Sequence, residues 1–179
     1  MKSTLNTSSP ALSAGSAQPS DGDHFMINDP STQGSTLSRA SIVVVDDHKI
    51  IRETLRVLLA DSETPVIGEA DSSAAALARV SELKPDLVIL DIRLPDENGL
   101  VTAARIHEQS PATKVLMLSG YTTPQIIKDA LRARAFGFVT KQEPALECVR
   151  AVRNVLRGTI HLSPEAMRIL AQEPHLHRP

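Results

Sequence analysis

Short apolar runs alternate with helical patterns over residues 41–158 of this 179-residue chain. Three of the runs are almost continuously apolar, as expected of strands that are covered on both faces. Between the runs, apolar residues recur at helical spacing, and Ile51, Leu55 and Leu58 fall on one helix face. Strict alternation of strands and helices predicts a doubly wound α/β fold, in which helices cover both faces of a parallel sheet. We expect the strands over residues 41–46, 65–70, 86–91, 114–119 and 137–141.

Capping residues support three of the predicted helices. The helix predicted over residues 72–83 starts at Ser72, a suitable N-cap. The helix over residues 123–134 opens with a threonine followed by proline, which favours a helix start. The helix over residues 143–158 also has a proline near its start, and it ends at Gly158, a residue type common just beyond a helix.

Both ends of the chain lack the alternation. The first 39 residues are rich in Ser, Thr, Gly and Pro and predict a disordered tail, because they offer too little apolar surface to offset ordering entropy. Met26 is a second candidate start beside Met1. Near the other end, Ser163 and Pro164 favour a short helix over residues 164–172. We therefore divide the chain into a tail (1–39), one domain (40–158) and a linker-like C-terminal tail (159–179).

Composition narrows the class of protein. The net charge is −2 and no long basic run is present, which argues against a nucleic-acid-binding patch. The single cysteine, Cys148, excludes an internal disulfide and fits a reducing compartment, and we expect it to pack inertly in a helix. No apolar run approaches the ~18 residues of a membrane span, and no secretory signal is evident. We predict a cytoplasmic protein without membrane contact.

Polar residues follow four of the predicted strands. Asp46 and Asp47 end the first strand, Asp91 ends the third, Ser119 the fourth and Lys141 the fifth. The carboxyl ends of parallel strands meet at one edge of a sheet, where ligands bind in such folds. Three clustered carboxylates repel one another and predict a raised pKa, unless a hard cation such as Mg²⁺ joins them. With a hydroxyl and an amine beside them, the acids indicate phosphoryl transfer to a carboxylate, with Asp91 as the nucleophile.

Four motifs carry a resemblance to a known family. The acid pair in "VVVDDH", the acceptor in "LVILDIRLPDENGL", the hydroxyl in "LMLSG" and the lysine in "AFGFVTK" occur in this order. Together they resemble the receiver domain of bacterial two-component response regulators, over residues 40–157. The run "DDHKIIRETLRVLL" is similar to the NarL/LuxR-type subfamily, in which an acid pair, a histidine and a later arginine open the first helix. The resemblance implies a flavodoxin/CheY-like sheet of five parallel strands in the order 2-1-3-4-5.

The resemblance also implies a role for each residue. Asp91 would accept phosphate from a sensor histidine kinase or a histidine phosphotransfer protein. Mg²⁺ would be held by the carboxylates and by one backbone carbonyl, and the phosphoryl group by a hydroxyl and an amine. The metal set is Asp46, Asp47, Asp91 and the carbonyl of Arg93; the phosphate set is Ser119 and Lys141.

Phe138 stands where the family has a switch aromatic. When Ser119 moves toward the phosphate, the aromatic side chain would fill the space left behind. The charge on the acceptor would thereby bias the surface formed by the fourth helix, the fifth strand and the fifth helix, to which a downstream protein would bind. A homodimer is left open.

Three positions qualify this resemblance. Arg134 stands where the family usually has glycine, so we expect the end of the preceding helix to be altered. Arg93 and Tyr121 flank the acceptor, each two residues beyond a site residue. Their bulk would hinder an attacking water, so we expect slow autodephosphorylation.

The subfamily usually continues into a helix-turn-helix of roughly 60 residues, for which this sequence leaves no space. We therefore expect a stand-alone phosphoacceptor that signals through protein contacts and is no turnover enzyme. A phosphorelay intermediate, a phosphate sink and a truncated DNA-binding regulator are the alternatives. A hydrolase is disfavoured by arginine at position 93, and a flavin module by the two acids after the first strand. A docking remnant without phosphorylation is disfavoured by the complete acid set.

Overall fold

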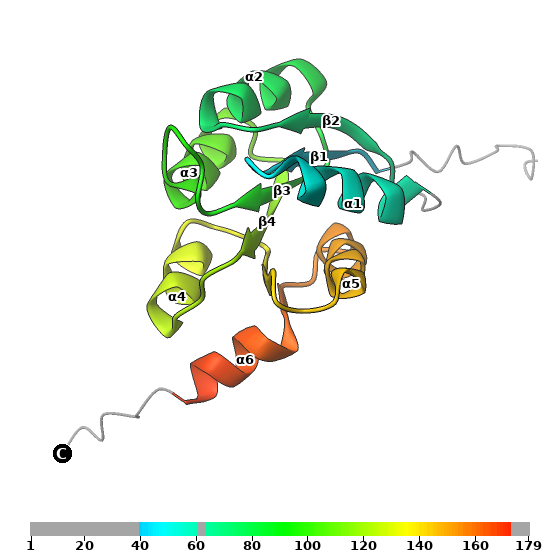
Figure 1. Cartoon of the computed structure of the whole chain (residues 1–179). Helices are drawn as coiled ribbons and strands as arrows, with labels where there is room; N and C mark the ends of the chain where they lie inside the picture. Colours follow the sequence, from blue (N-terminus) through cyan, green and yellow to red (C-terminus); the bar gives the residue numbers. More distant parts are fainter. Residues whose placement is uncertain (1–39, 61–63, 173–179) are drawn as a thin grey trace, which may run out of the picture. The chain divides into compact units, whose positions relative to one another are not determined.

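The computed structural model describes residues 40–60 and 64–172 (Figure 1). The tail predicted over residues 1–39, and with it the choice between Met1 and Met26, lies outside the described residues. In the described part no helix combines the length and the apolar character needed to cross a membrane.

A parallel sheet organises the described residues, in the order β2-β1-β3-β4-β5-β6. Its strands are β1 (Ile42–Val45), β2 (Val66–Ala70), β3 (Leu87–Asp91), β4 (Lys114–Ser119), β5 (Gly137–Thr140) and β6 (His161–Leu162). Its helices are α1 (Lys49–Ala60), α2 (Ser73–Leu83), α3 (Gly99–Gln109), α4 (Pro124–Arg132), α5 (Ala145–Leu156) and α6 (Pro164–Ala171). The first five strands and helices follow the predicted alternation, and the doubly wound α/β class is confirmed.

The predicted number of strands is wrong: the sheet has six strands within the described residues, not five. The additional strand, β6, pairs in parallel with β5, so that Gly137 lies beside His161 and Phe138 beside Leu162. Two paired residues are too few to produce an apolar run or an alternating pattern, so the strand could not be recognised from its sequence.

Each face of the sheet packs against its own helices (Figure 1). Successive residues of β1 alternate between the faces: Val43 packs with residues of α2 and α3, and Val44 with residues of α1 and α5. Cys148 belongs to the second of these clusters, and burial raises the pKa of its thiol to about 12. The thiol therefore stays protonated, as its predicted inert packing requires.

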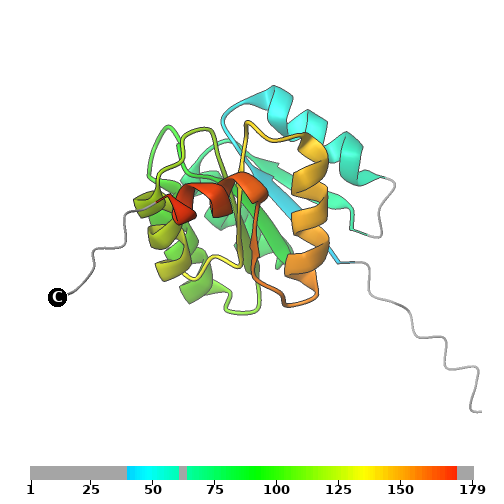
Figure 2. The same ribbon diagram turned by 90° about the horizontal axis from the view of Figure 1, so that it is seen from below.

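Three side-chain caps fix helix starts. Ser72 accepts a hydrogen bond from the third residue of its helix, as predicted, and Thr123 does the same for α4. Ser163 caps α6, the short helix expected near the C-terminus. Helix α6 contacts α4 and β5 (Figure 2), and its Ala166 is fully buried. We call β5 together with β6 and α6 the covered edge of the sheet.

Candidate functional site

The carboxyl ends of β1, β3, β4 and β5 place the predicted polar residues together. Asp46 follows β1, Asp91 ends β3, Ser119 ends β4 and Lys141 follows β5. Because these strands are parallel neighbours, their ends lie at one edge of the sheet. Asp91, Lys141, His48, Arg93 and Tyr121 line one hollow there, together with Ile50, Ile51 and Gly120.

Three carboxylates and one imidazole gather at this edge. Asp46, Asp47, His48 and Asp91 each offer one ligand atom, and these atoms all lie within 4.8 Å of one another. Asp46 and Asp91 are buried, whereas Asp47 and His48 are exposed. The His48 Nδ1 atom lies 2.6 Å from Asp47 Oδ1, and the His48 amide donates to Asp46 Oδ1 at 2.9 Å. We call Asp46, Asp47 and Asp91 the acid corner.

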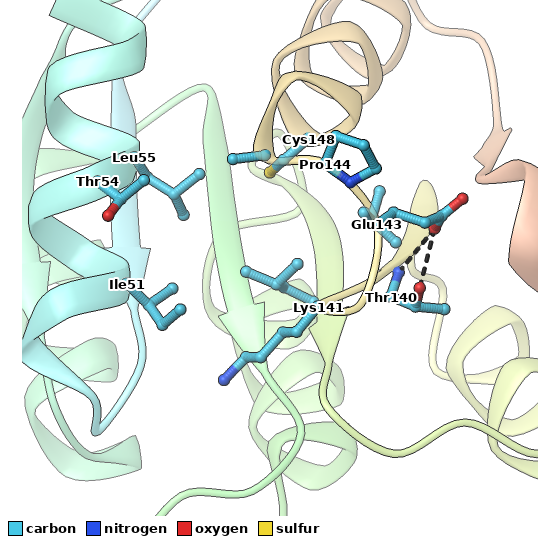
Figure 3. A pocket seen from close by; sticks show the side chains of 11 residues that line it. Ile51, Thr54, Leu55, Thr140, Lys141, Glu143, Pro144 and Cys148 are labelled. Atoms are coloured by element: carbon cyan, nitrogen blue, oxygen red, sulfur yellow. Dashed lines mark hydrogen bonds between the residues drawn. The ribbon is translucent and has the colours of Figure 1, made fainter.

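Lys141 bridges the two buried carboxylates. Its Nζ atom lies 2.6 Å from Oδ2 of Asp46 and 2.6 Å from Oδ2 of Asp91. Burial alone would lower the pKa of Lys141, but the bonds to Asp46 and Asp91 outweigh it and raise the pKa above 10.5. The ammonium group therefore stays charged. Figure 3 shows this side chain reaching from the end of β5 away from Glu143, which bonds to Thr140 instead.

Asp91 is held in a position where its charge is unfavourable. Burial raises its pKa above the ordinary 3.8, although the bond from Lys141 acts in the opposite direction. The predicted raised pKa thus falls on the residue expected to be the nucleophile. Gly99 passes directly behind it: a Cβ atom at Gly99 would lie 2.0 Å from the Asp91 carbonyl oxygen. The Gly99 amide donates to the carbonyl of Ile92 at 2.7 Å, so this close crossing fixes the backbone around Asp91.

Ser119 is close to the site but bonded elsewhere. Its hydroxyl donates to the carbonyl of Tyr121 at 2.5 Å and accepts from the Tyr121 amide at 3.2 Å. The guanidinium of Arg93 lies over the Tyr121 ring, 5.4 Å from its centroid, and both side chains are exposed. The Arg93 amide donates to Asp91 Oδ1 at 3.3 Å. The two residues predicted to hinder water are therefore paired with each other beside Asp91.

Phe138 lies in the core rather than at the acid corner. Its side chain is fully buried in the cluster that packs against α4 and α6. The Phe138 carbonyl accepts from the Ser163 amide at 2.9 Å, which fastens the start of α6 to β5. Two residues further, Thr140 donates through its amide and its hydroxyl to Glu143, whose other oxygen accepts from the Glu165 amide. The covered edge is thus bonded to the strand that carries Lys141.

A match to a protein family agrees with this geometry. The model of the response regulator receiver domain matches residues 42–153, which is more than half of the chain. The chain belongs to this family. Receiver domains of response regulators are signalling domains rather than conventional enzymes, and the NarL/LuxR-type relatives below confirm the predicted resemblance.

Curated relatives extend beyond the receiver. The "DNA-binding transcriptional activator DevR/DosR" of Mycobacterium tuberculosis is 40% identical over 130 residues, which cover 72% of this chain and 60% of the relative. The "Probable transcriptional regulatory protein NarL" of the same species is 35% identical over 136 residues, with 75% and 63% covered. The chain therefore spans about three fifths of the length of these two relatives.

Solved receiver structures share the fold. A two-component response regulator of the LuxR family from Aurantimonas sp. SI85-9A1 gives a TM-score of 0.72 at 31% identity and covers 76% of this chain and 98% of that one. The signal receiver domain of the putative response regulator NarL from Mycobacterium tuberculosis gives 0.64 at 36% identity, covering 68% and 98%.

The acid corner of this receiver fits the cofactor that was predicted from the sequence. Its three carboxylates supply oxygen ligands, the type that Mg²⁺ prefers. Their ligand atoms lie within 4.8 Å of one another, and the single positive charge of Lys141 does not balance three negative charges. Receiver domains bind Mg²⁺ through such acidic residues. Asp46, Asp47 and Asp91 would hold the ion, and the carbonyl of Arg93 as a further ligand stays a prediction.

Two residues of this receiver belong to the site although the sequence does not predict them there. Gly99 lies in the same motif as Asp91, but the backbone crossing behind Asp91 is a tertiary feature without a local signature. Arg52 lies in the run that is similar to the NarL/LuxR-type subfamily. Its Nη1 atom donates to the Asp46 carbonyl at 2.6 Å, a contact that helical spacing alone does not specify.

Proposed function

We propose that this receiver acts in the cytoplasm, where it takes up a phosphoryl group on Asp91 from the phosphohistidine of a sensor histidine kinase or a histidine phosphotransfer protein. One observation carries the proposal: Lys141 Nζ lies 2.6 Å from each of two buried carboxylates, one of which is the acceptor. A buried carboxylate with a raised pKa and a specific charge partner, lying in a hollow, marks a candidate functional site.

In the transfer, one Asp91 oxygen attacks phosphorus as the phosphorus–nitrogen bond of the donor breaks. The bonding electrons leave with the imidazole, and an acyl phosphate remains on Asp91. Lys141, already beside Asp91, moves its hydrogen bond to a phosphoryl oxygen, and Ser119 releases the Tyr121 carbonyl to bond to another. When bound, Mg²⁺ would offset the negative charge that gathers between the acids and the phosphoryl group.

The output that we propose is a protein–protein contact at the face of α4, β5 and α5. Helix α6 contacts α4 and β5, so the partner would meet a surface to which α6 contributes. Homodimerisation through this face is the second form of the same output. Transfer of the phosphate to another protein, or its loss as a sink, remains the alternative. Control of transcription is a second candidate function, because the relatives named above are described as transcriptional regulators.

Phosphorylation itself is the decisive test. The protein is incubated with Mg²⁺ and acetyl phosphate and separated by phosphate-affinity electrophoresis. The expected result is a retarded band for the wild type and none for Asp91→Asn. Asp129→Asn, which removes an exposed carboxylate on α4, is the matched control and should be retarded like the wild type. Absence of retardation in the wild type would refute the phosphoacceptor function.

The Arg93–Tyr121 pair supports slow hydrolysis of the acyl phosphate. Both side chains line the hollow beside Asp91, where the attacking water must enter. We expect Tyr121→Ala to shorten the half-life of the phosphorylated protein. Leu146→Ala, which removes an exposed apolar side chain on α5, should leave the half-life unchanged. Equal half-lives for Tyr121→Ala and the wild type would contradict this role.

A further inference from the structure

Arg52 is a largely buried cation behind the acid corner, without direct contact to its carboxylates. It is the fourth residue of α1, and its side chain is only 15% exposed. Its Nη1 atom donates to the backbone carbonyl of Asp46 at 2.6 Å, and its Nε atom donates to Glu69 Oε2 at 3.2 Å. The guanidinium fork thus ties the end of β1 to the end of β2. We infer that Arg52 is a positioning residue that fixes the acid pair for Mg²⁺.

The contact acts on the peptide between the two acids. The Asp46 amide donates to the Ala70 carbonyl at 3.1 Å, and the Asp46 carbonyl accepts from Arg52. Both backbone groups of Asp46 are therefore bonded, which fixes the plane of the peptide that leads into Asp47. A charge-assisted hydrogen bond from a planar guanidinium is strong and directional.

Asp47 depends on this backbone more than Asp46 does. The Asp46 carboxylate is itself held, by the His48 amide and by Lys141. The Asp47 carboxylate contacts the exposed imidazole of His48, and its own side chain is 40% exposed. The direction of the Asp47 side chain is therefore set mainly by its backbone, which Arg52 orients.

Arg56 provides an internal comparison. It also pairs with Glu69, at 3.4 Å, but its side chain is 58% exposed, and this ion pair does not extend to the Asp46 carbonyl. If Arg52 only neutralised Glu69, the two arginines would be equivalent. The carbonyl bond distinguishes them, and it predicts that only Arg52 affects the metal site.

Losing the charge of Arg52 and losing its positioning effect would change the affinity for Mg²⁺ in opposite directions, so an experiment can separate the two. Removing a cation near the acids would strengthen binding of Mg²⁺ by Coulomb's law, whereas loosening the acid pair would weaken it. The double variant Arg52→Met/Glu69→Gln removes one charge of each sign and so isolates position. Arg79→Met/Glu82→Gln, which removes an exposed pair on α2, is the matched control.

The measurement is titration calorimetry of Mg²⁺ binding to the unphosphorylated protein. We expect the dissociation constant of Arg52→Met/Glu69→Gln to rise by about tenfold, the loss typical of a residue that supports metal ligands. The control pair should match the wild type. Arg52→Lys keeps the charge but loses the planar fork, so its dissociation constant for Mg²⁺ should lie between those of the wild type and the double variant. It serves as the test variant if the double variant does not fold.

This inference rests on the proposed Mg²⁺-dependent phosphorylation, and the two are separable. Positioning predicts that excess Mg²⁺ restores full phosphorylation of the Arg52 variants by acetyl phosphate, because only the Mg²⁺ requirement has changed. Unchanged or tighter Mg²⁺ binding by the variants, or no binding by the wild type, overturns the inference. Wild-type protein that binds Mg²⁺ but is never phosphorylated overturns the proposed function alone.

Discussion

The acid corner and the covered edge lie on either side of Lys141, and opposite kinds of interaction hold them. At the acid corner, two carboxylates are buried around one ammonium group, and burial raises the pKa of Asp91. At the covered edge, Phe138 and Ala166 are fully buried in an apolar cluster. Burial of the acids lowers the stability of the fold, and apolar burial at the covered edge offsets part of that loss.

Strand β5 links the two regions, because it is part of the covered edge and the lysine that follows it contacts two residues of the acid corner. Its end carries Lys141, whose amide donates to the Ser119 carbonyl at 2.7 Å. Its other groups bond to β6 and, through Glu143, to α6. Burial acts to raise the pKa of Glu143, but the hydrogen bonds from Ser163, Glu165 and Thr140 together lower it, so its charge is well held. The strand that leads to Lys141 is therefore also the strand to which α6 is bonded.

Crowding at the acid corner is the strongest way to disturb it. In Gly99→Ala the new Cβ would lie 2.0 Å from the Asp91 carbonyl, so backbone must move. We expect a loss of about 3 kcal/mol in the free energy of unfolding, measured with urea, together with reduced phosphorylation of Asp91. In Gly120→Ala the nearest atom, on Lys141, is 3.8 Å away, so this control should lose far less. Equal losses would show that the crossing at Gly99 is not a constraint.

A charge placed under α6 breaks the covered edge. Ala166 is fully buried, whereas its neighbour Met167 is 54% exposed. We expect Ala166→Glu to cost about 2 kcal/mol, limited by detachment of α6 rather than by burial of the charge. Met167→Glu adds the same charge to the same helix and should cost less than about 0.5 kcal/mol. Hydrogen exchange should show the loss of protection confined to β6 and α6; protection unchanged from the wild type would mean that the edge is not held by this contact.

The two regions also differ in how well the sequence predicts them. The acid corner follows from strand ends that local apolar runs define, so the sequence alone is enough to bring Asp46, Asp91, Ser119 and Lys141 together. The covered edge is not predictable in this way, because a two-residue strand such as β6 has no periodicity of its own. The enclosure of Phe138 by β6 and α6 could not be predicted for the same reason. Contacts made across the fold, such as that between Arg52 and the Asp46 carbonyl, have no local signature either.

Neutralising Asp91 should stabilise the fold, whereas the two preceding substitutions should destabilise it. The raised pKa of Asp91 means that its ionised form is less favourable in the folded chain than in the unfolded one. We expect Asp91→Asn to raise the Tm at neutral pH by a few degrees, as about 1 kcal/mol does in a domain of this size. Below pH 3.8 both proteins carry a neutral side chain, so the difference should vanish there and grow as the pH rises through the folded-state pKa. Hydrogen bonds from Gln125 and Arg132 lower the pKa of Asp129, so the control Asp129→Asn should not stabilise the fold.

The end of α4, which borders the covered edge, carries a smaller strain that one substitution relieves. Arg134 has a φ of 62°, the left-handed conformation that favours glycine. The helix nevertheless closes normally: the Arg134 amide donates to the Leu131 carbonyl at 3.1 Å and the Ala135 amide to the Ala130 carbonyl at 3.0 Å. Arg134→Gly should therefore gain about 0.5–1 kcal/mol in the free energy of unfolding. Arg134→Ala keeps a Cβ and should gain nothing, so equal gains for both would assign the effect to the lost charge rather than to the backbone.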